Sequence, residues 1–206
     1  MVKLMKKFFL TLAVISFATV ACQAQTEPQL SDVEQQALLV RAREASSALM
    51  SGLQKQLKSA IKQDGVAAAV TTCSVIAPAL ASQTSQSHQL KVRRVSTKNR
   101  NPQATPDAFE TQALQQWPEQ LSAPQAPEEH YALEMQGDKP VFRYVKAIRT
   151  QQACLQCHGQ AVAAEVKQAI QKHYPQDKAF GYEMGALRGA ISVEIPVVVE
   201  QEQSRN

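Results

Sequence analysis

The sequence predicts an α+β domain in which long helices come first and an antiparallel set of strands, interrupted by helices and loops, follows. Two observations carry this prediction. Residues 31–81 repeat apolar side chains at helical spacing, whereas Val- and Ile-rich extended segments alternate with turn residues after residue 89. About 180 residues remain once a leader is removed, which suits one domain with a sizeable core.

Residues 1–21 have the features of a secretory signal peptide. Three lysines precede an apolar run over residues 8–20, which is too short for a membrane span and is followed by small residues. Residues 19–22 resemble a bacterial lipobox, so we expect Cys22 to be lipidated and residues 22–30 to form a short linker. The alternative is cleavage after Ala24 and a freely soluble protein. Either outcome predicts a location in the periplasm, with outer-membrane attachment in the lipidated case.

The charge balance argues against a nucleic-acid partner. The chain carries 22 Lys and Arg against 18 Asp and Glu, a net charge of +4. Since three of the lysines lie in the leader, the mature net charge falls to about +1, which is no electrostatic footprint for nucleic acid.

The helical part consists of two predicted helices. Ser31 and Glu34 form a capping-box pattern at the start of a helix over residues 31–63, and Gly65 then interrupts it. A second helix over residues 66–81 is apolar on nearly all sides, so we expect it to be buried, with Pro78 bending or shortening its last turns. Cys73 lies in the middle of this second helix.

The rest of the chain predicts strands, turns and short helices. Residues 89–96 are extended, with Leu90, Val92 and Arg94 facing one way. Pro106 is expected at the first position of a short helix that ends near Trp117. The remaining elements are a turn at 99–102, a Pro-rich loop at 118–127, strands at 131–135 and 141–148 joined by a turn at 137–138, a helix at 161–174, a Gly-rich loop at 181–189, a strand at 190–199 broken by Pro196, and a polar tail at 200–206. The folded domain is expected to cover residues 31–199.

Cys154, Cys157 and His158 form a C-x-x-C-H motif, the attachment site of a c-type haem. Two thiols at this spacing add across the vinyl groups of one porphyrin, and the next residue places an imidazole under the iron. A zinc knuckle would need a second Cys/His pair, which has no suitable spacing here. A thioredoxin-like redox pair would need a βαβ context and no following histidine.

The cysteine count leaves one thiol over. Of the 4 cysteines, two belong to the motif and Cys22 lies at the cleavage site. Cys73 therefore has no partner, and a lone thiol in an oxidising compartment is open to oxidation unless it is buried or bound to metal.

The sequence predicts no catalytic group of its own. It has no phosphate-binding glycine loop, no G-x-S-x-G and no HExxH motif. We therefore expect the haem to supply the chemistry and the protein to tune it, and we expect no enzyme activity.

Three segments together resemble the haem c-binding PAS-like domain family. They are residues 92–102, which contain VRRVS and NRNP, the motif at 154–158, and GYEMGALRGAISV at 181–193. The resemblance covers roughly residues 31–196. The family occurs as a stand-alone exported protein and as the extracytoplasmic sensor part of bacterial signalling proteins.

This resemblance implies a PAS-like antiparallel sheet, flanked by helices, that holds one covalent haem. It also implies that the iron is bound by His158 and by a thiolate from an N-terminal helix, and Cys73 is the matching residue. The other candidates for the sixth ligand are Met184, His173, His130 and His88, of which His88 and His173 lie in polar surroundings. Four arginines are candidates for the haem propionates through charge-assisted hydrogen bonds: Arg93, Arg94, Arg100 and Arg188.

The sequence thus predicts a periplasm-facing monohaem c-type cytochrome. One hypothesis is a redox or small-gas sensor, in which the bond from iron to Cys73 breaks and the freed helix transmits the change. The alternative is a low-potential electron carrier that keeps both ligands, and a haem peroxidase is a third, less favoured class. The chain shows no output domain, so a sensor would act on a partner protein.

Overall fold

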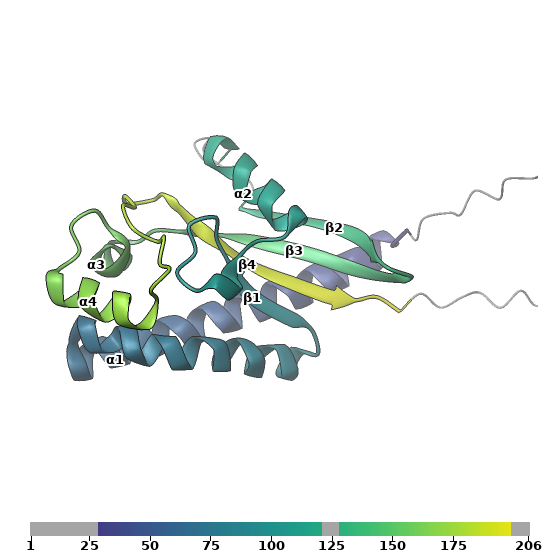
Figure 1. Cartoon of the computed structure of the whole chain (residues 1–206). Coiled ribbons are helices and arrows are strands. Elements are labelled where there is room, and N and C mark those ends of the chain that lie inside the picture. The colour runs from purple at the N-terminus through teal and green to yellow at the C-terminus, as the bar shows by residue number, and fades with distance from the viewer. Residues whose placement is uncertain (1–28, 121–127, 199–206) are drawn as a thin grey trace, which may run out of the picture.

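The computed structural model describes residues 29–120 and 128–198. The predicted signal peptide at 1–21, Cys22, the start of the linker, most of the Pro-rich loop and the tail at 200–206 lie outside the described residues. Within them the order of elements is helical first and mixed afterwards, so the α+β class is confirmed (Figure 1).

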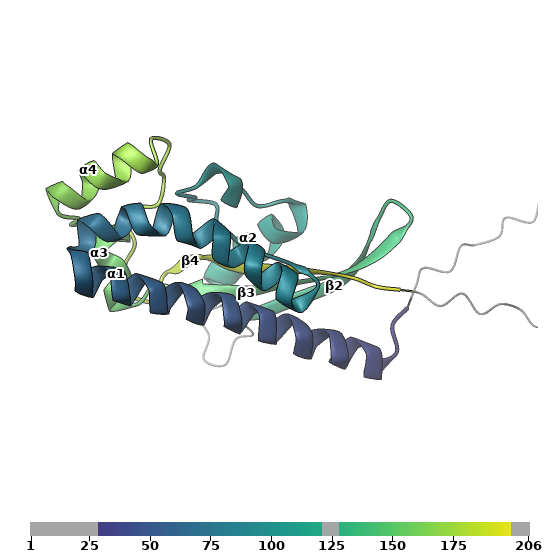
Figure 2. The same cartoon turned by 90° about the horizontal axis from the view of Figure 1, so that it is seen from below.

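The first element is α1 (Asp32–His88), which consists of two helices joined at Gly65. Ser31 and Glu34 form the expected capping box at its start. Gly65 has φ 83° and ψ 173°, a conformation open to glycine, and there the chain reverses so that the two halves lie side by side (Figure 2). A Cβ atom on Gly52 would lie 3.7 Å from Leu80 Cδ2, so the halves pack closely.

The second half of α1 departs from the sequence prediction in two ways. It continues past Pro78 to His88 instead of ending at residue 81, and Gln89 closes it in the left-handed region at φ 53°. The hydroxyl groups of Thr84 and Ser85 donate to carbonyls one turn back. This half is also less buried than its composition indicates, since Val75 is 69 % exposed. It lies on the surface because only one of its faces meets the rest of the domain.

By length and composition alone, an 18-residue window of α1 could cross a membrane, with a mean hydropathy of 1.6. The same helix packs against the sheet through Leu39 and Leu49 and against α4 through Val70. We therefore treat it as part of the folded domain.

The sheet has four antiparallel strands in the order β1-β4-β3-β2. The strands are β1 (Lys91–Val95), β2 (Glu129–Gln136), β3 (Lys139–Arg149) and β4 (Leu187–Pro196). Gly137 and Asp138 form the predicted two-residue turn between β2 and β3, with Gln136 paired to Lys139 and Gly137 at φ 63°. Strand β4 ends at Pro196 and starts three residues before the predicted bound, and it lies between β1 and β3 because it pairs with both.

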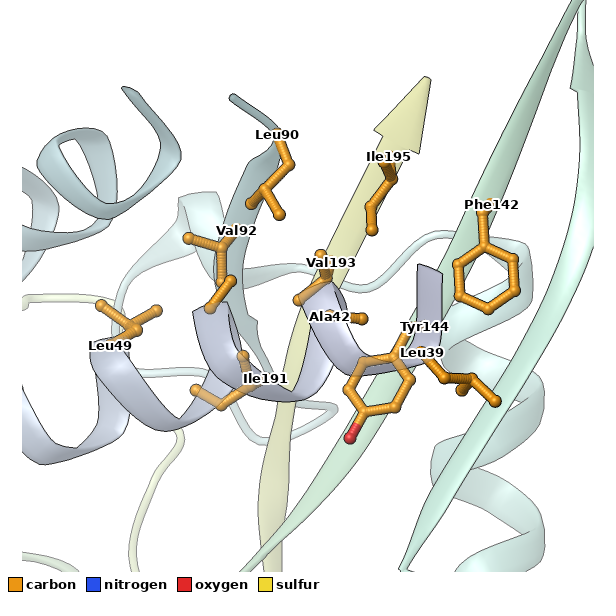
Figure 3. Packing of buried hydrophobic residues seen from close by; sticks show 11 residues of the cluster. Leu39, Ala42, Leu49, Leu90, Val92, Phe142, Tyr144, Ile191, Val193 and Ile195 are labelled. Carbon is orange, nitrogen blue, oxygen red and sulfur yellow. The ribbon is translucent and has the colours of Figure 1, made fainter. Parts of the chain in front are cut away.

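Each face of the sheet is covered by a helix. The first half of α1 packs Leu39, Ala42, Ala45 and Leu49 onto side chains from β1, β3 and β4 (Figure 3). The opposite face carries α2 (Ala108–Gln120), whose Phe109 and Trp117 pack on the sheet. Its first helical residue is Ala108, so the prediction of Pro106 at that position is wrong. Asp107 accepts the Glu110 N–H at the start of α2, and Pro106 precedes this contact.

A short 3-10 turn, η1 (Pro102–Ala104), lies beside β1, since the Ser96 amide donates to the Ala104 carbonyl at 3.0 Å. The other elements gather at one end of the sheet. They are a second 3-10 turn, η2 (Gln152–Cys154), the single-turn α3 (Leu155–His158) and α4 (Ala164–His173). Helix α4 starts three residues later than the sequence predicts. The Gly65 turn of α1 lies at this same end, whereas the start of α1 and the end of β4 lie at the other end (Figure 1).

Candidate functional site

The C-x-x-C-H motif follows shortly after β3, and the residue between them, Thr150, is held in place by hydrogen bonds. Thr150 is buried, and both its amide and its hydroxyl donate to the Ala186 carbonyl, at 2.8 and 2.6 Å. The chain then forms η2 and α3, which place the thiols of Cys154 and Cys157 on one short helical turn. Both thiols are free.

His158 is held in one orientation and one tautomer. Its Nδ1 atom lies 2.9 Å from the Ala179 carbonyl oxygen. A carbonyl accepts only, so Nδ1 carries the proton and Nε2 keeps its lone pair. Burial, together with the charges of the nearby Arg188 and Arg100, lowers the pKa of the imidazole to about 2. The residue is thus a neutral imidazole with one nitrogen available to a metal.

A backbone link fixes the loop that follows α4 against the motif. The amides of Gly181 and Tyr182 donate to the carbonyls of Gly159 and His158, at 3.1 and 3.0 Å. The Tyr182 ring stands edge-on to the imidazole, with centroids 6.3 Å apart and planes at 89°. Loop and motif therefore form one unit around His158.

Cys73 reaches this region from α1. One turn earlier, Val70 packs against Val166 and Ile170 of α4, and Cys157 packs against this same cluster. The Cys73 thiol is free and half-buried. Burial raises its pKa, while the charges of Arg94 and Arg100 oppose that shift. The structure therefore brings Cys73, Cys157 and His158 into one region, although 81 residues separate Cys73 from Cys154 in the chain.

Three of the four predicted arginines face this region. Arg94 makes no hydrogen bond to any residue in the described ranges. Much of its side chain is exposed, but the protein around the guanidinium desolvates this group and so lowers its pKa. Arg188 donates to Ser96 Oγ at 3.1 Å and lies over the Tyr182 ring. Desolvation also lowers the pKa of Arg188, and Arg94 and Arg100 reinforce that shift. The site is therefore strongly electropositive.

Arg100 joins three backbone segments. It donates to the Cys157 carbonyl at 2.7 Å and to the Ala179 carbonyl at 3.5 Å, and it pairs with Asp177 at 3.1 Å. The Nε atoms of Arg100 and Arg188 are buried without a hydrogen-bond partner. Two buried guanidinium N–H groups thus lack an acceptor in a region that holds three arginines, and an anion bound there would satisfy them.

Arg93 lies on the other face of the sheet. It pairs with the buried Glu110 of α2 and donates to the carbonyls of Gln103 and Thr105, at 3.2 and 3.1 Å. The structure does not bring it to His158. Strand alternation is the signal for this, because a strand that turns Arg94 towards α1 turns Arg93 towards α2.

The other candidate sixth ligands are placed differently. Met184 is 63 % exposed in the Gly-rich loop, and His130 stacks on Phe109 under α2 with centroids 5.3 Å apart. His88 ends α1 at the far end of the helix, whereas His173 shares a 2.9 Å hydrogen bond with Thr71. Of these, only His173 lies beside the helix turn that carries Cys73, and its Nε2 is engaged.

Several residues of the site carry no signal in the sequence. Asp177, Ala179 and Lys98 hold the loop through contacts that include those to Arg100, His158 and the Phe180 carbonyl, respectively. Tyr174 closes α4 and packs against the cluster that also contacts Cys157. These roles depend on the loop conformation between α4 and β4, which no periodicity predicts.

No cluster in the described ranges suits a simple metal ion, since none groups three or more His, Cys, Asp or Glu side chains around one point. Tyr182 also lines a surface hollow of about 500 Å³, together with residues that include Arg149, Glu183 and Leu187. This hollow does not lie between Cys73 and His158. The candidate site is therefore identified by the contacts of the His158 imidazole and of the cysteine thiols, and not by a cavity.

The chain is thus an α+β protein whose four-stranded antiparallel sheet lies between helices. It carries a C-x-x-C-H motif at one end of the sheet and a further free thiol on the neighbouring part of α1. Residues 24–196 match the profile of the Tll0287-like family, so the chain belongs to that family. The family relationship that the motifs indicated is thereby confirmed.

One solved structure is similar over nearly its whole length. It is the crystal structure of the cyanobacterial haem protein Tll0287, with a TM-score of 0.57 and 23 % sequence identity, covering 84 % of this chain and 100 % of that one. This likeness shows the fold. No curated protein matches the chain.

Proposed function

We propose that this protein is a monohaem c-type cytochrome in which Cys154 and Cys157 hold the porphyrin and His158 and Cys73 bind the iron. The observation that carries the proposal is the neutral His158 imidazole, whose protonated Nδ1 is fixed by Ala179 and whose Nε2 is left to a metal. The solved relative named as a haem protein supports it.

The residues present fit a haem. Three free thiols and one available imidazole nitrogen supply the covalent and axial bonds. Arg94, Arg100 and Arg188 supply more positive charge than Asp177 balances, and two of them have unpartnered Nε atoms. Haem propionates are anions of the right kind, so these three arginines are the proposed propionate partners.

A bound haem supplies one-electron redox chemistry and a site for small gases. The protein sets which of these is used. If Cys73 bound the iron as a thiolate together with His158, it would donate charge to the iron, which would stabilise the ferric state and lower the reduction potential.

We favour a sensor because the half of α1 that carries Cys73 joins the first half at Gly65, where the helix is interrupted. This half is held by packing of Leu80 and Ala81 on the sheet core and of Val70 on α4, while no hydrogen bond to the Cys73 sulfur ties it to the motif within the described residues. A bond from Cys73 to iron would therefore add a contact whose loss could change the position of this half. If Cys73 left the iron, this half of α1 would change between two positions. Helix α4 would move with it, because Val70 packs against α4. The change would pass to a partner protein.

We also propose export to the periplasm, with attachment to the outer membrane through a lipid on Cys22. The leader and the lipobox-like residues 19–22 support this. Mass spectrometry of the mature N-terminus distinguishes a lipidated Cys22 from a chain that starts after Ala24.

The first test is the haem itself. The exported protein should show a Soret band and a mass gain of one porphyrin, both lost in the Cys154→Ser, Cys157→Ser double variant. EPR of the ferric protein should show a low-spin thiolate signal that vanishes in Cys73→Ser and persists in the control Met184→Leu. An unchanged signal in Cys73→Ser would refute the axial pair.

The second test separates sensor from carrier. If Cys73 leaves on reduction, the ferrous protein binds CO rapidly, and Cys73→Ser binds it at least as fast. A ferrous protein that stays six-coordinate and ignores CO contradicts the sensor and leaves a low-potential electron carrier.

A further inference from the structure

Tyr182 contacts His158 through both its backbone and its ring. The Tyr182 amide donates to the His158 carbonyl at 3.0 Å, and the Tyr182 ring stands at 89° to the imidazole, with the ring centroids 6.3 Å apart. A perpendicular arrangement at this separation is one that aromatic rings prefer. The two contacts join Tyr182 to the residue that carries the available imidazole nitrogen.

The hydrogen bond from His158 to Ala179 does not by itself fix the plane of the imidazole. It holds Nδ1 at 2.9 Å from the Ala179 carbonyl oxygen, but the ring can still rock about the line of that bond. A second ring at right angles to the imidazole removes this freedom, provided that the second ring cannot move. The orientation of the imidazole thus depends on what holds Tyr182.

Two anchored cations hold the Tyr182 ring. Tyr182 is 7 % exposed, and Lys98 Nζ and the Arg188 guanidinium carbon lie over its ring, 4.6 and 5.2 Å from the centroid. Lys98 Nζ also donates to the Phe180 carbonyl. Arg188 donates to Ser96 Oγ at 3.1 Å and to the Lys98 carbonyl at 3.4 Å. Because both cations are tied to the surrounding backbone, their attraction fixes the ring in place.

We propose that Tyr182 is a positioning residue for the axial imidazole: its ring keeps the His158 imidazole in one plane when Nε2 binds the haem iron. Lys98 and Arg188 act through this ring. The inference rests on the proposed function, because it requires His158 to be an iron ligand. A side chain that only filled space would support the loop without defining the plane of the imidazole.

The consequence is a difference between the two axial ligands. His158 is held by Ala179 and by Tyr182, whereas no hydrogen bond within the described residues holds the Cys73 sulfur. A ligand that is already held in its bonding orientation loses less freedom on binding, so its bond to iron is favoured. The imidazole should therefore stay on the iron when the thiolate leaves.

The test compares Tyr182→Leu, which removes the ring, with Tyr182→Phe, which keeps it. EPR of the ferric protein reports the plane of an axial imidazole through the g values of the low-spin iron. Tyr182→Leu should lose the single narrow set of g values and give a broadened or second set, whereas Tyr182→Phe should keep the native set. The control Tyr131→Leu makes the same chemical change on β2, away from the site, and should leave the spectrum unchanged.

Native g values and line widths in Tyr182→Leu overturn the proposal. If this variant yields no haem-loaded protein, Lys98→Gln decides, because it removes an exposed cation and keeps the ring. Broadened lines in Lys98→Gln then support the proposal, and native lines overturn it.

His158→Ala tests the proposed function separately. If it keeps the native ferric signal, His158 is not a ligand, and the role of Tyr182 fails together with the proposed axial pair. If the native signal is lost in His158→Ala but intact in Tyr182→Leu, only the role of Tyr182 fails.

Discussion

Arg100 connects the C-x-x-C-H motif to the loop before β4, because its guanidinium contacts the Cys157 carbonyl, the Ala179 carbonyl and the Asp177 carboxylate. Its guanidinium is 13 % exposed and pairs with an Asp177 carboxylate that is 2 % exposed. Removing one partner of such a pair leaves the other charge buried without compensation. This residue thus stabilises the site by its own contacts, independently of the propionate role proposed for it.

We predict that Arg100→Gln lowers the free energy of unfolding by about 3 kcal/mol, because Asp177 would lose its ion pair and two carbonyls would lose a donor. Urea unfolding of the purified protein measures it. The control is Arg41→Gln, whose guanidinium makes a 3.5 Å contact to the His88 carbonyl at an exposed position, with an expected change within about 0.5 kcal/mol. Equal effects of the two variants would contradict the structural role of Arg100.

Glu129 gives the fold a predictable response to acid. The Arg43 guanidinium and the Tyr144 hydroxyl, which donates at 2.9 Å, hold the pKa of this carboxyl below its ordinary value of 4.5. A lowered folded-state pKa stabilises the protein above the ordinary pKa, and this contribution disappears as the pH falls through the folded-state pKa.

Glu129→Gln should therefore cost about 1 kcal/mol of unfolding free energy at pH 7, since Arg43 is 45 % exposed and solvent screens the pair. The difference from the native protein should shrink between pH 7 and pH 3, because below the ordinary pKa of 4.5 the unfolded chain binds a proton at Glu129 more readily than the folded protein does. Urea unfolding at the two pH values measures this. Glu128→Gln, at an exposed ion pair with Arg149, is the control, with an expected change below about 0.5 kcal/mol at either pH. A cost for Glu129→Gln that grows on acidification would show the sign to be wrong.

At the scale of elements, Gly65 determines the shape of α1. Its φ of 83° with ψ of 173° is a backbone conformation that other residues rarely adopt, and a Cβ atom there would meet nothing within 4 Å. The cost of a side chain is therefore conformational and not steric.

We predict that Gly65→Ala lowers the free energy of unfolding by about 1–2 kcal/mol. The matched variant Gly52→Ala lies inside a helical half and makes only ordinary contact with Leu80, so it should stabilise the protein by about 0.5–1 kcal/mol. Thermal unfolding of both variants shows the opposite signs. A neutral Gly65→Ala would contradict the conformational strain expected at residue 65, and a destabilised Gly52→Ala would show that the two halves of α1 leave no room for a methyl group there.

The sequence predicted the elements better than their ends. The capping box, the break at Gly65 and the hairpin at Gly137 follow from local chemistry, and the structure confirms all three. The extension of α1 past Pro78 does not follow from it, because Leu80 and Ala81 pack on the core cluster and this packing outweighs the lost backbone hydrogen bond.

The site was predictable only in part, for the same reason. The motif and the odd thiol were visible in the chain, and in the structure Cys73 lies one helical turn after Val70, whose cluster also contacts Cys157. The loop contacts of Asp177 and Ala179, and the burial of Glu110 between Arg93 and Arg143, depend on partners distant in sequence. No local pattern encodes such pairs.

For the whole molecule, the packing divides into a sheet core and a site region. The two clusters on the faces of the sheet contain no residue of the motif, whereas the third joins Val70, α4 and Cys157. The three clusters are therefore expected to differ in local stability.

We predict that loss of the haem loosens the site region and spares the sheet. In the Cys154→Ser, Cys157→Ser double variant, amide exchange should accelerate in α4 and around Val70, while the amides of β3 and β4 keep their native protection. Hydrogen–deuterium exchange with mass spectrometry measures both in one sample, with the sheet as internal reference. Uniform loss of protection would contradict this division.

The position of the motif opposite the start of α1 has a further consequence. The first half of α1 runs for 33 residues from Asp32 to Asp64, about 50 Å of helix. If the chain were tethered by a lipid on Cys22, the length of this helix would separate the motif thiols and the His158 imidazole from the tethered end of the domain, and so from the bilayer. Diffusing gases or proteins would then meet them from the aqueous side without touching the membrane.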